Sequence, residues 1–347
     1  MKRKLLSKAR TVFIQKTMTQ LSPKTVWNTS EKELLSILTA GALVPKPKNI
    51  RFYAPSFTYH ETKRVRARPN WFPTVSVTGK GCALHCKHCN GKVLETMQPA
   101  GTPEKLLELA ARLKQNGAQG CLVSGGCLPD GSVPLTQFIP VLAKIKHELG
   151  LTVFVHTGII DAETAEALKS AGVDAALIDI IGSNKTIEEI YNLNVTVKDY
   201  ANSLGALHEA GLTFVPHIIV GLHNGQLRGE LHALKMTARY EPSALVIIAF
   251  MPIRGTAMAE VEPPQPADVA RVTATARLMF PETPLALGCM RPKGKRRAET
   301  DILALQAGVN AVAFPSEEAI RYAENQGYEI SFSPYCCAQI YMDRNAE

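Results

Sequence analysis

Three cysteines lie within eight residues of one another in the stretch GKGCALHCKHCNGK, as Cys82, Cys86 and Cys89. An even number of thiols could close disulfides or complete a tetrahedral zinc site. Three thiolates on a four-iron cluster instead leave one iron without a protein ligand. The spacing therefore predicts a [4Fe–4S] cluster with an open iron. A zinc site that adds His85 or His88 is the alternative, although zinc motifs normally come as paired ligand hairpins.

The segments around these cysteines predict an α/β fold. From residue 72 onward, apolar β-rich runs alternate with amphipathic helical segments such as 102–117, where Thr102 is a good N-cap and Pro103 suits the first helical position. Near-continuous apolar runs are typical of parallel strands covered on both faces. We predict strands at 72–79, 120–126, 152–158, 174–182, 213–222, 244–252, 284–290 and 311–315.

Eight strand-helix units predict a (β/α)₈ barrel of the TIM type, with an open doubly wound sheet as the alternative. The barrel is expected over 72–315, after an N-terminal extension (1–71) with one helix at 31–41. A C-terminal helix and a cysteine-containing tail (316–347) are expected to fold over the barrel mouth. Chemistry in such a barrel gathers at the C-terminal ends of the strands, where the three-cysteine loop should emerge.

The composition favours a soluble protein with an anionic partner. The 347 residues are 46% hydrophobic, carry a formal charge of +8 and contain no secretory signal or run of eighteen apolar residues, so we expect a cytoplasmic protein without membrane contact. Basic residues gather at 1–10, 63–68 and 291–297. No nucleic-acid-binding pattern accompanies them. An acidic carrier protein would suit them, and ordinary solvated loops are equally compatible with them.

The pattern Cys82-x₃-Cys86-x₂-Cys89 after a first barrel strand resembles the signature of the radical S-adenosylmethionine (SAM) superfamily. The resemblance implies that these three cysteines are catalytic and that SAM chelates the open iron through its amino and carboxylate groups. One electron from the cluster would then break a C–S bond of SAM and release a 5′-deoxyadenosyl radical.

Further segments resemble the SAM-binding elements of that superfamily in the expected order along the chain. The glycine motif SGG would let the backbone approach the methionine moiety, although Cys127 replaces the acidic residue that often follows. Asp179 would contact the ribose, His88 the adenine, and IVGL and FMPIRGT would support them. The implied cofactor-binding residues are His88, Ser124, Gly125, Gly126, Asp179, Gly221, Leu222 and Met251. His156, His217 and His223 lie at strand ends and are interpreted as core or loop histidines, with His156 and His217 facing the barrel interior. Iron ligation or a hydrogen bond to substrate is the alternative.

Over residues 70–315 the chain is most similar to biotin synthase and its relatives. Biotin synthase draws sulfur from a [2Fe–2S] cluster held by cysteines of its second, third and fifth strands. Here only Cys121 fits that pattern, so biotin formation is not expected. Cys121 and Cys127 would be about 20 Å apart along an extended strand, which is too far to share one cluster, so Cys121 is interpreted as a buried core thiol. The remaining thiols are candidate ligands of an auxiliary [4Fe–4S] cluster, namely Cys127, Cys289, Cys336 and Cys337. An incidental CC pair in the tail is the alternative.

Within this group the chain most resembles the members of the two-protein lipoyl synthase. That resemblance implies sulfur insertion at C6 or C8 of an octanoyl-lysine on an acidic lipoyl-carrier domain, with sulfur from the auxiliary cluster. It also implies a partner radical SAM protein and a reductant such as ferredoxin or flavodoxin. Two alternatives stay open: a biotin-synthase-like rearrangement or cofactor maturation without sulfur donation, and a non-catalytic metal-binding assembly factor.

Overall fold

A single parallel sheet organises the protein. The computed structural model describes residues 21–43, 47–56, 59–68 and 70–344. Eleven strands pair in the order β11-β1-β10-β9-β8-β7-β6-β5-β4-β2-β3, and every pairing is parallel. All eight predicted strands are present: β2 (Thr74–Ser76), β4 (Gly120–Ser124), β5 (Thr152–His156), β6 (Ala175–Asp179), β7 (Phe214–Val220), β8 (Leu245–Ala249), β9 (Leu285–Leu287) and β10 (Ala311–Ala313). The predicted TIM-type α/β fold is confirmed.

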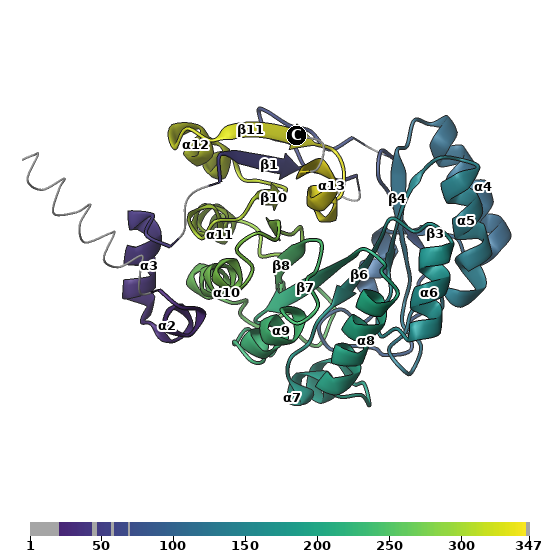
Figure 1. Cartoon of the computed structure of the whole chain (residues 1–347), viewed down its shortest axis with the longest axis horizontal. Coiled ribbons are helices and arrows are strands. Elements are labelled where there is room, and N and C mark those ends of the chain that lie inside the picture. Colours follow the sequence, from purple (N-terminus) through teal and green to yellow (C-terminus); the bar gives the residue numbers. More distant parts are fainter. Residues whose placement is uncertain (1–20, 44–46, 57–58, 69, 345–347) are drawn as a thin grey trace, which may run out of the picture.

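The sheet curls without closing on itself (Figure 1). The eighth predicted strand, β10, does not pair with the first, β2. Instead, β10 pairs with β9 on one side and with β1 (Asn49–Tyr53) on the other, and β1 pairs in turn with β11 (Glu329–Ser333). At the opposite end of the sheet, β2 pairs with β3 (Gln98–Pro99). The sequence interpretation missed these three strands. β3 is only two residues long, and β1 and β11 lie outside the range 72–315 in which the barrel was expected.

Helices cover the outer face of the curled sheet (Figure 1). The longer ones are α3 (Glu31–Ala40), α4 (Pro103–Gln115), α5 (Ile139–His147), α6 (Ala162–Ser170), α8 (Val197–Glu209), α9 (Glu230–Thr237), α10 (Pro266–Met279), α11 (Lys295–Gln306) and α12 (Glu317–Asn325). Short elements are α2 (Pro23–Asn28), η1 (Lys92–Thr96), η2 (Thr136–Phe138), α7 (Asn184–Thr186), η3 (Ile187–Tyr191), η4 (Cys337–Gln339) and α13 (Ile340–Arg344). The predicted cap of α4 is confirmed, because the Thr102 side chain accepts the N–H of Lys105. Among the described residues, no helix is both long and apolar enough to cross a bilayer.

Two hydrophobic cores lie on opposite faces of the sheet. The larger one fills the space between the strands and the surrounding helices. The smaller one lies inside the curl, where inward side chains such as Phe154, Val215 and Val246 meet the C-terminal tail. The N-terminal helices α2 and α3 pack against α10, where the Arg271 guanidinium donates to three backbone carbonyls of the Val26–Thr29 segment at 2.7–3.1 Å. The domain boundaries expected at residues 71 and 315 stay predictions, although β1 and β11 belong to the same sheet as the strands between them.

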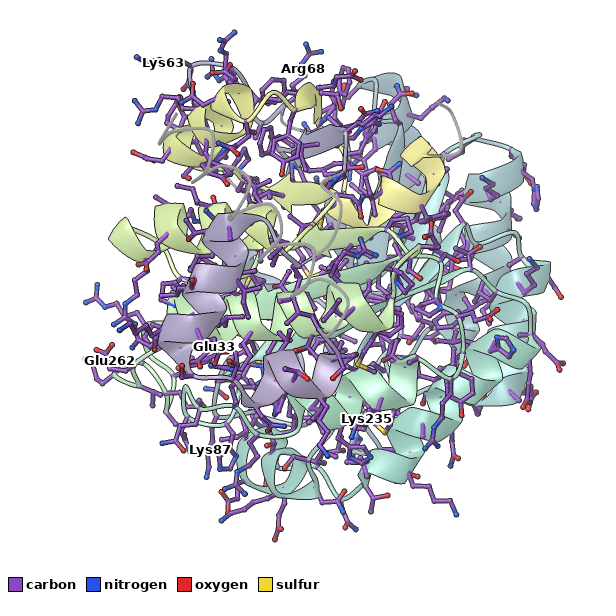
Figure 2. The ribbon with its side chains drawn as sticks, turned by 60° about the vertical axis from the view of Figure 1, so that its left-hand side comes forward. Glu33, Lys63, Arg68, Lys87, Lys235 and Glu262 are labelled. Atoms are coloured by element: carbon purple, nitrogen blue, oxygen red, sulfur yellow. The ribbon has the colours of Figure 1, made fainter. Side chains whose placement is uncertain are left out.

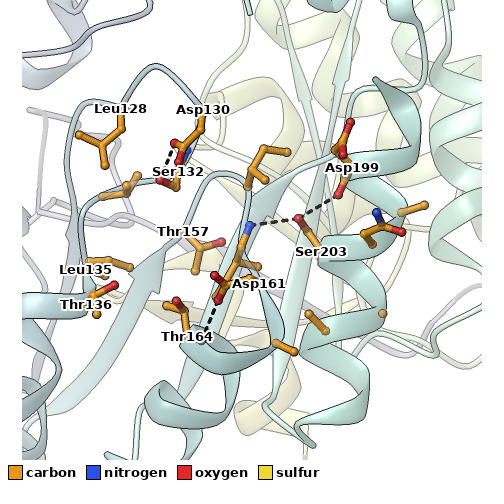
Figure 3. A pocket seen from close by; sticks show the side chains of 18 of the residues that line it. Leu128, Asp130, Ser132, Leu135, Thr136, Thr157, Asp161, Thr164, Asp199 and Ser203 are labelled. Carbon is orange, nitrogen blue, oxygen red and sulfur yellow. Dashed lines mark hydrogen bonds between the residues drawn. The ribbon is translucent and has the colours of Figure 1, made fainter. Parts of the chain in front are cut away.

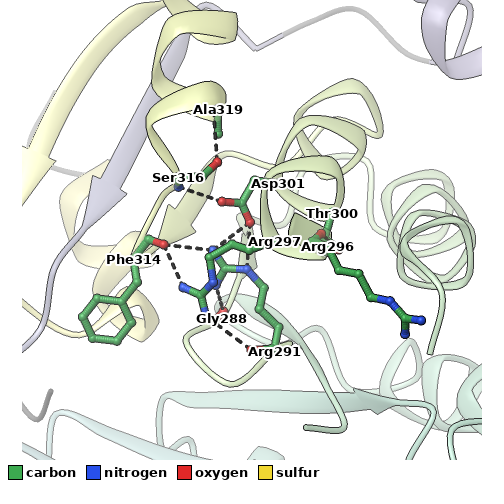
Figure 4. A network of polar contacts seen from close by, with 9 residues as sticks. All are labelled: Gly288, Arg291, Arg296, Arg297, Thr300, Asp301, Phe314, Ser316 and Ala319. Atoms are coloured by element: carbon green, nitrogen blue, oxygen red, sulfur yellow. Dashed lines mark hydrogen bonds and ion pairs between the residues drawn. The ribbon is translucent and has the colours of Figure 1, made fainter. Parts of the chain in front are cut away.

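The predicted basic cluster at 291–297 is mainly structural. Arg291 is fully buried and forms an ion pair with Asp301 at 2.8 Å, and its guanidinium also donates to the Gly288 carbonyl at 2.5 Å (Figure 4). Arg297 donates to the carbonyls of Phe314 and Arg291. These guanidinium groups satisfy backbone carbonyls around a buried loop, so they are unavailable to a partner.

Of the other two basic clusters, the structure describes only the one at 63–68. Residues 1–10 lie outside the described residues. In the cluster at 63–68, Arg64 pairs with Glu324 at 2.8 Å and Arg68 lies over the Trp71 ring. Figure 2 shows Lys63 and Arg68 at one end of the molecule and Lys87, on the three-cysteine loop, near the other.

Candidate functional site

The three-cysteine loop leaves the end of β2 and folds back on itself. Within it, the backbone N–H groups of Cys89 and Asn90 both donate to the Cys86 carbonyl, at 3.2 and 2.8 Å. Left-handed backbone at His85 and Asn90 permits the tight reversal. The sulfur atoms of Cys86 and Cys89 and a ring nitrogen of His88 lie within 4.8 Å of one another. Local turns therefore bring these donors close together.

The electrostatics of the loop favour a thiolate. Hydrogen bonding from the Cys86 thiol lowers the pKa of Cys89, against the opposing effect of burial, and His88 and the backbone of Gly91 also lower it. The same contact, together with burial, raises the pKa of Cys86. A metal or cluster needs deprotonated thiols, so a loop that already stabilises one thiolate suits an iron–sulfur cluster.

The glycine motif at the end of β4 holds this loop in place. The N–H of Gly126 donates to Thr78 Oγ1 at 2.7 Å, and that hydroxyl donates to the Gly81 carbonyl at 2.8 Å. A Cβ at position 126 would lie 2.0 Å from the Gly81 carbonyl oxygen and 2.6 Å from Cys82 Cβ. Neighbouring Gly125 packs on Thr78 in the same way, with a Cβ position 3.1 Å from its side chain. The glycines thus let the strand end lie against the cysteine loop.

Cys127 belongs to this loop, contrary to the sequence prediction that it joins the tail cysteines. Its carbonyl accepts the N–H of Ala83 at 2.8 Å. Burial raises the pKa of Cys127 to about 12, and the largest charge effects on it come from Cys82 and Asp179. The reason is local: residue 127 follows Gly126, which is itself held against the loop.

Two buried polar atoms beside the loop have no hydrogen-bond partner among the described residues. They are His88 Nδ1 and the Tyr191 hydroxyl, on rings whose centroids lie 5.1 Å apart. Tyr191 is the last residue of η3. Its backbone carbonyl accepts a hydrogen bond from the Cys86 thiol, with 3.4 Å between the sulfur and the oxygen. An orphaned buried polar atom is costly unless a ligand satisfies it. The pair fits a polar ligand such as the adenosyl group of SAM, and no sequence motif pointed to Tyr191.

Asp179 and two histidines converge inside the curl. Asp179 ends β6, His156 ends β5 and His217 lies in β7. The Nε2 atom of His156 is 3.4 Å from Asp179 Oδ1, and the two imidazole centroids are 5.8 Å apart. Although burial opposes it, the charges of His156, His217 and His88 hold the pKa of Asp179 below its usual value. Burial lowers the pKa of His217 to about 4.

The remaining candidate cofactor-binding residues lie at neighbouring strand ends. Ser124 ends β4, and its hydroxyl donates to the His156 carbonyl at 3.3 Å. Gly221 follows β7 with a left-handed φ of 71°, and its N–H donates to the buried Glu230 carboxylate at 2.9 Å. Leu222 is buried next to it, and Met251 is half-buried after β8. These positions follow the order expected for a ligand held along the strand ends.

The tail cysteines form a second group deep inside the curl. Cys337 is buried in the inner core, and Cys289 and Cys336 pack against it. The pKa of Cys289 is raised to about 12, first by burial and then by the charge of Cys336. Among the described residues, no three of Cys127, Cys289, Cys336 and Cys337 bring their sulfur atoms within 4.8 Å of one another. The predicted four-thiol set is therefore not assembled, because Cys127 lies at the other cysteine loop.

The tail also takes a different path from the one expected. Its Tyr335 ring packs on Trp71 and Phe72, which precede β2, and the Tyr341 hydroxyl donates to the Asp174 carbonyl, which precedes β6, at 2.9 Å. The tail thus reaches the N-terminal ends of the strands instead of covering the mouth at their C-terminal ends. Large inward aromatic contacts draw it into the curl.

Two further features lie at the periphery of this site. Cys121 is confirmed as a core thiol, since it is buried in the outer core and burial raises its pKa to about 12. A separate cavity of about 800 Å³ lies outside the curl, between the loops after β4 and β5 and helix α8 (Figure 3). Its three aspartates already accept backbone N–H groups, and Asp161, for example, accepts that of Thr164 at 2.8 Å. It holds none of the candidate site residues.

Comparison with known proteins agrees with this geometry. The family model of the Radical SAM superfamily matches residues 76–228. The biotin synthase of Zymomonas mobilis is 26% identical over 249 residues, which cover 69% of this chain and 72% of that protein. The biotin synthase of Neorickettsia sennetsu is 26% identical over 297 residues, covering 83% and 86%.

Two solved structures share the fold. HydG, a maturase of the [FeFe]-hydrogenase, superposes with a TM-score of 0.64 at 17% identity, over 97% of this chain and 78% of that chain. Methylornithine synthase (PylB) superposes with a TM-score of 0.60 at 15% identity, over 96% and 99%.

Proposed function

Because this chain belongs to the radical SAM superfamily and has biotin synthase homologues, we propose that it is a sulfur-inserting radical enzyme. We assign it as one component of a two-protein lipoyl synthase. It adds sulfur at C6 or C8 of an octanoyl group attached to a lysine of an acidic carrier domain. The observation that carries the proposal is the presence of two separate thiol groups inside one curled sheet: the three-cysteine loop and the tail cysteines.

The three-cysteine loop supplies the radical-generating half of this site. Cys82, Cys86 and Cys89 would hold a [4Fe–4S] cluster, with His88 and Tyr191 offering polar atoms to the adenosyl group of SAM. When bound, these cofactors supply a 5′-deoxyadenosyl radical that removes hydrogen from an unactivated carbon. The polypeptide holds the loop against β4 through Thr78.

The tail supplies the proposed sulfur-donating half. Cys289, Cys336 and Cys337 are candidate ligands of an auxiliary cluster, and Cys127 is no longer included in that set. The inner core also contributes apolar side chains, such as Leu122, Ile219 and Ile248. Apolar walls suit an octanoyl chain, whose burial is favourable by roughly 0.8 kcal/mol per methylene.

The proposed partners are acidic proteins, which suit the basic surface of the three-cysteine loop. Lys80 and Lys87 are exposed on the three-cysteine loop, where an acidic reductant such as ferredoxin or flavodoxin would approach the cluster. An acidic lipoyl-carrier domain and a second radical SAM protein complete the proposed system.

A direct assay tests the proposal. The reconstituted protein is incubated anaerobically with SAM, dithionite and an octanoyl-lysine peptide, and the products are analysed by mass spectrometry. We expect 5′-deoxyadenosine together with a peptide that has gained sulfur. Formation of 5′-deoxyadenosine with this peptide unchanged would count against the octanoyl assignment.

One observation favours a second candidate, a biotin-synthase-like rearrangement or maturation reaction without sulfur donation. The four thiols expected for an auxiliary cluster do not gather in one place. The triple variant Cys289→Ala/Cys336→Ala/Cys337→Ala separates the two functions. A sulfur-inserting enzyme would lose sulfur transfer and keep SAM cleavage, whereas the second candidate would keep all of its turnover.

A further inference from the structure

Three polar side chains, His156, Asp179 and His217, converge at the centre of the curl. They come from the adjacent strands β5, β6 and β7, whose register places Asp179 opposite His217. One donor atom from each lies within 4.8 Å of the other two. Three independent strands thus direct two imidazoles and a carboxylate toward one point.

The tautomer of His217 leaves a lone pair available at this point. Its Nδ1 atom lies 3.1 Å from the Val215 carbonyl oxygen. A carbonyl oxygen only accepts hydrogen bonds, so Nδ1 carries the proton and Nε2 is the unprotonated atom. Histidines that bind metals are commonly held in this way, with the second nitrogen donating to a backbone carbonyl.

The separation of His156 and Asp179 also fits a shared cation. Their closest atoms, Nε2 and Oδ1, are 3.4 Å apart. A well-formed N–H···O hydrogen bond is shorter, about 2.7–3.2 Å. Two donors that each lie ~2.1 Å from a tetrahedral ion are separated by ~3.4 Å, which matches the observed distance.

The site is also accessible. The side chains of His156 and Asp179 are 26% and 31% exposed to solvent. An incoming ion therefore does not have to cross the packed inner core, and three protein donors leave positions for water or substrate.

We propose that His156, Asp179 and His217 form a binding site for a single divalent transition-metal ion, separate from both thiol groups. Two imidazoles and one carboxylate suit Fe²⁺, Co²⁺ or Zn²⁺ better than Mg²⁺ or Ca²⁺, which prefer all-oxygen sites. The second oxygen of Asp179 is free to serve the ribose of SAM, so the two roles are compatible. The inference does not depend on the proposed sulfur-inserting function.

Cobalt is the probe that distinguishes this site from the cysteines. The full-length protein with its reconstituted cluster is desalted anaerobically and titrated with Co²⁺, with metal content and visible absorption recorded together. We expect one additional Co²⁺ per chain, with weak ligand-field bands and no thiolate-to-cobalt charge transfer. Thiolates would add intense charge-transfer absorption, so binding at Cys289 or Cys336 is recognisable.

Single substitutions assign the ligands. His156→Ala, His217→Ala and Asp179→Asn should each weaken Co²⁺ binding by more than the roughly 10–100-fold that loss of a supporting residue costs. His147→Ala is the matched control, because His147 is an exposed histidine in the last turn of α5. The iron content of each variant reports whether the fold is intact, and His217→Gln replaces His217→Ala if that content falls.

Two results would overturn the inference. One is the absence of Co²⁺ binding to the wild-type protein beyond its cluster. The other is binding that survives all three ligand substitutions and disappears in Cys289→Ala/Cys336→Ala/Cys337→Ala, which would place the ion at the tail. Neither result bears on sulfur insertion, because the measurement contains neither SAM nor octanoyl substrate.

Discussion

The hydroxyl of Thr78 accepts the backbone N–H of Gly126 at 2.7 Å and thereby ties the end of β4 to the three-cysteine loop. The same hydroxyl donates to the Gly81 carbonyl, one residue before the first cysteine. The contact leaves no room for a side chain at position 126. Two segments that lie 48 residues apart in sequence therefore position the thiols jointly.

Gly126→Ala should displace the cysteine loop. The added Cβ would lie 2.0 Å from the Gly81 carbonyl, and relieving such overpacking typically costs about 1–3 kcal/mol. We expect the iron retained per chain after anaerobic reconstitution to fall well below that of the wild type. Gly101→Ala is the matched control, since its Cβ would meet no atom closer than 3.9 Å. Equal iron content in the two variants would contradict this account.

Tyr191→Phe should change stability and SAM affinity in opposite directions. The buried hydroxyl has no partner within the described part of the chain, and such a group costs about 1–3 kcal/mol. Removing it should leave the SAM-free protein at least as stable in urea unfolding. SAM affinity should fall roughly tenfold, the equivalent of one typical hydrogen bond. Tyr240→Phe, at the outer cavity, should change neither quantity, and unaltered SAM affinity in Tyr191→Phe would show that the hydroxyl does not contact the ligand.

Cys127→Ala tests where this thiol belongs. Because Cys127 lies beside Cys82, its loss should leave the iron of any cluster at the tail unchanged. Cys336→Ala/Cys337→Ala should instead remove tail-bound iron and keep the Mössbauer signal of the loop cluster. The measurement is an iron and sulfide count with Mössbauer spectra on both variants. A matching loss of tail-bound iron in the two variants would return Cys127 to the auxiliary ligand set.

Breaking the buried Arg291–Asp301 ion pair should strongly destabilise the fold. Both side chains are fully buried, and removing one partner leaves the other charge uncompensated, at a cost of about 3–5 kcal/mol. Arg291→Met should therefore lower the free energy of unfolding in urea by that amount. The double variant Arg291→Met/Asp301→Leu should lose less than the sum of the single variants. Additive losses would mean that the two charges do not depend on each other.

The sequence by itself determined the features that arise from local patterning. Apolar runs of strand length predicted all eight barrel strands, and the close spacing of the cysteines predicted a loop that gathers metal-ligating side chains, of which the structure brings Cys86, Cys89 and His88 together. Both signals are contained within a few residues. Turn geometry and the periodicity of apolar residues act there over short stretches of the chain.

Only the tertiary structure decided how distant segments meet. β1 joins β10 and β11 across more than 250 residues, so no local pattern could reveal that the predicted barrel stays open. Cys127 and Cys289 looked equivalent in sequence, yet Gly126 holds one at the cysteine loop and the tail surrounds the other. Arg291 looked like part of a basic surface patch until Asp301 was found beside it in the interior. Such outcomes depend on which buried partners the folded chain supplies, and sequence position does not encode that choice directly.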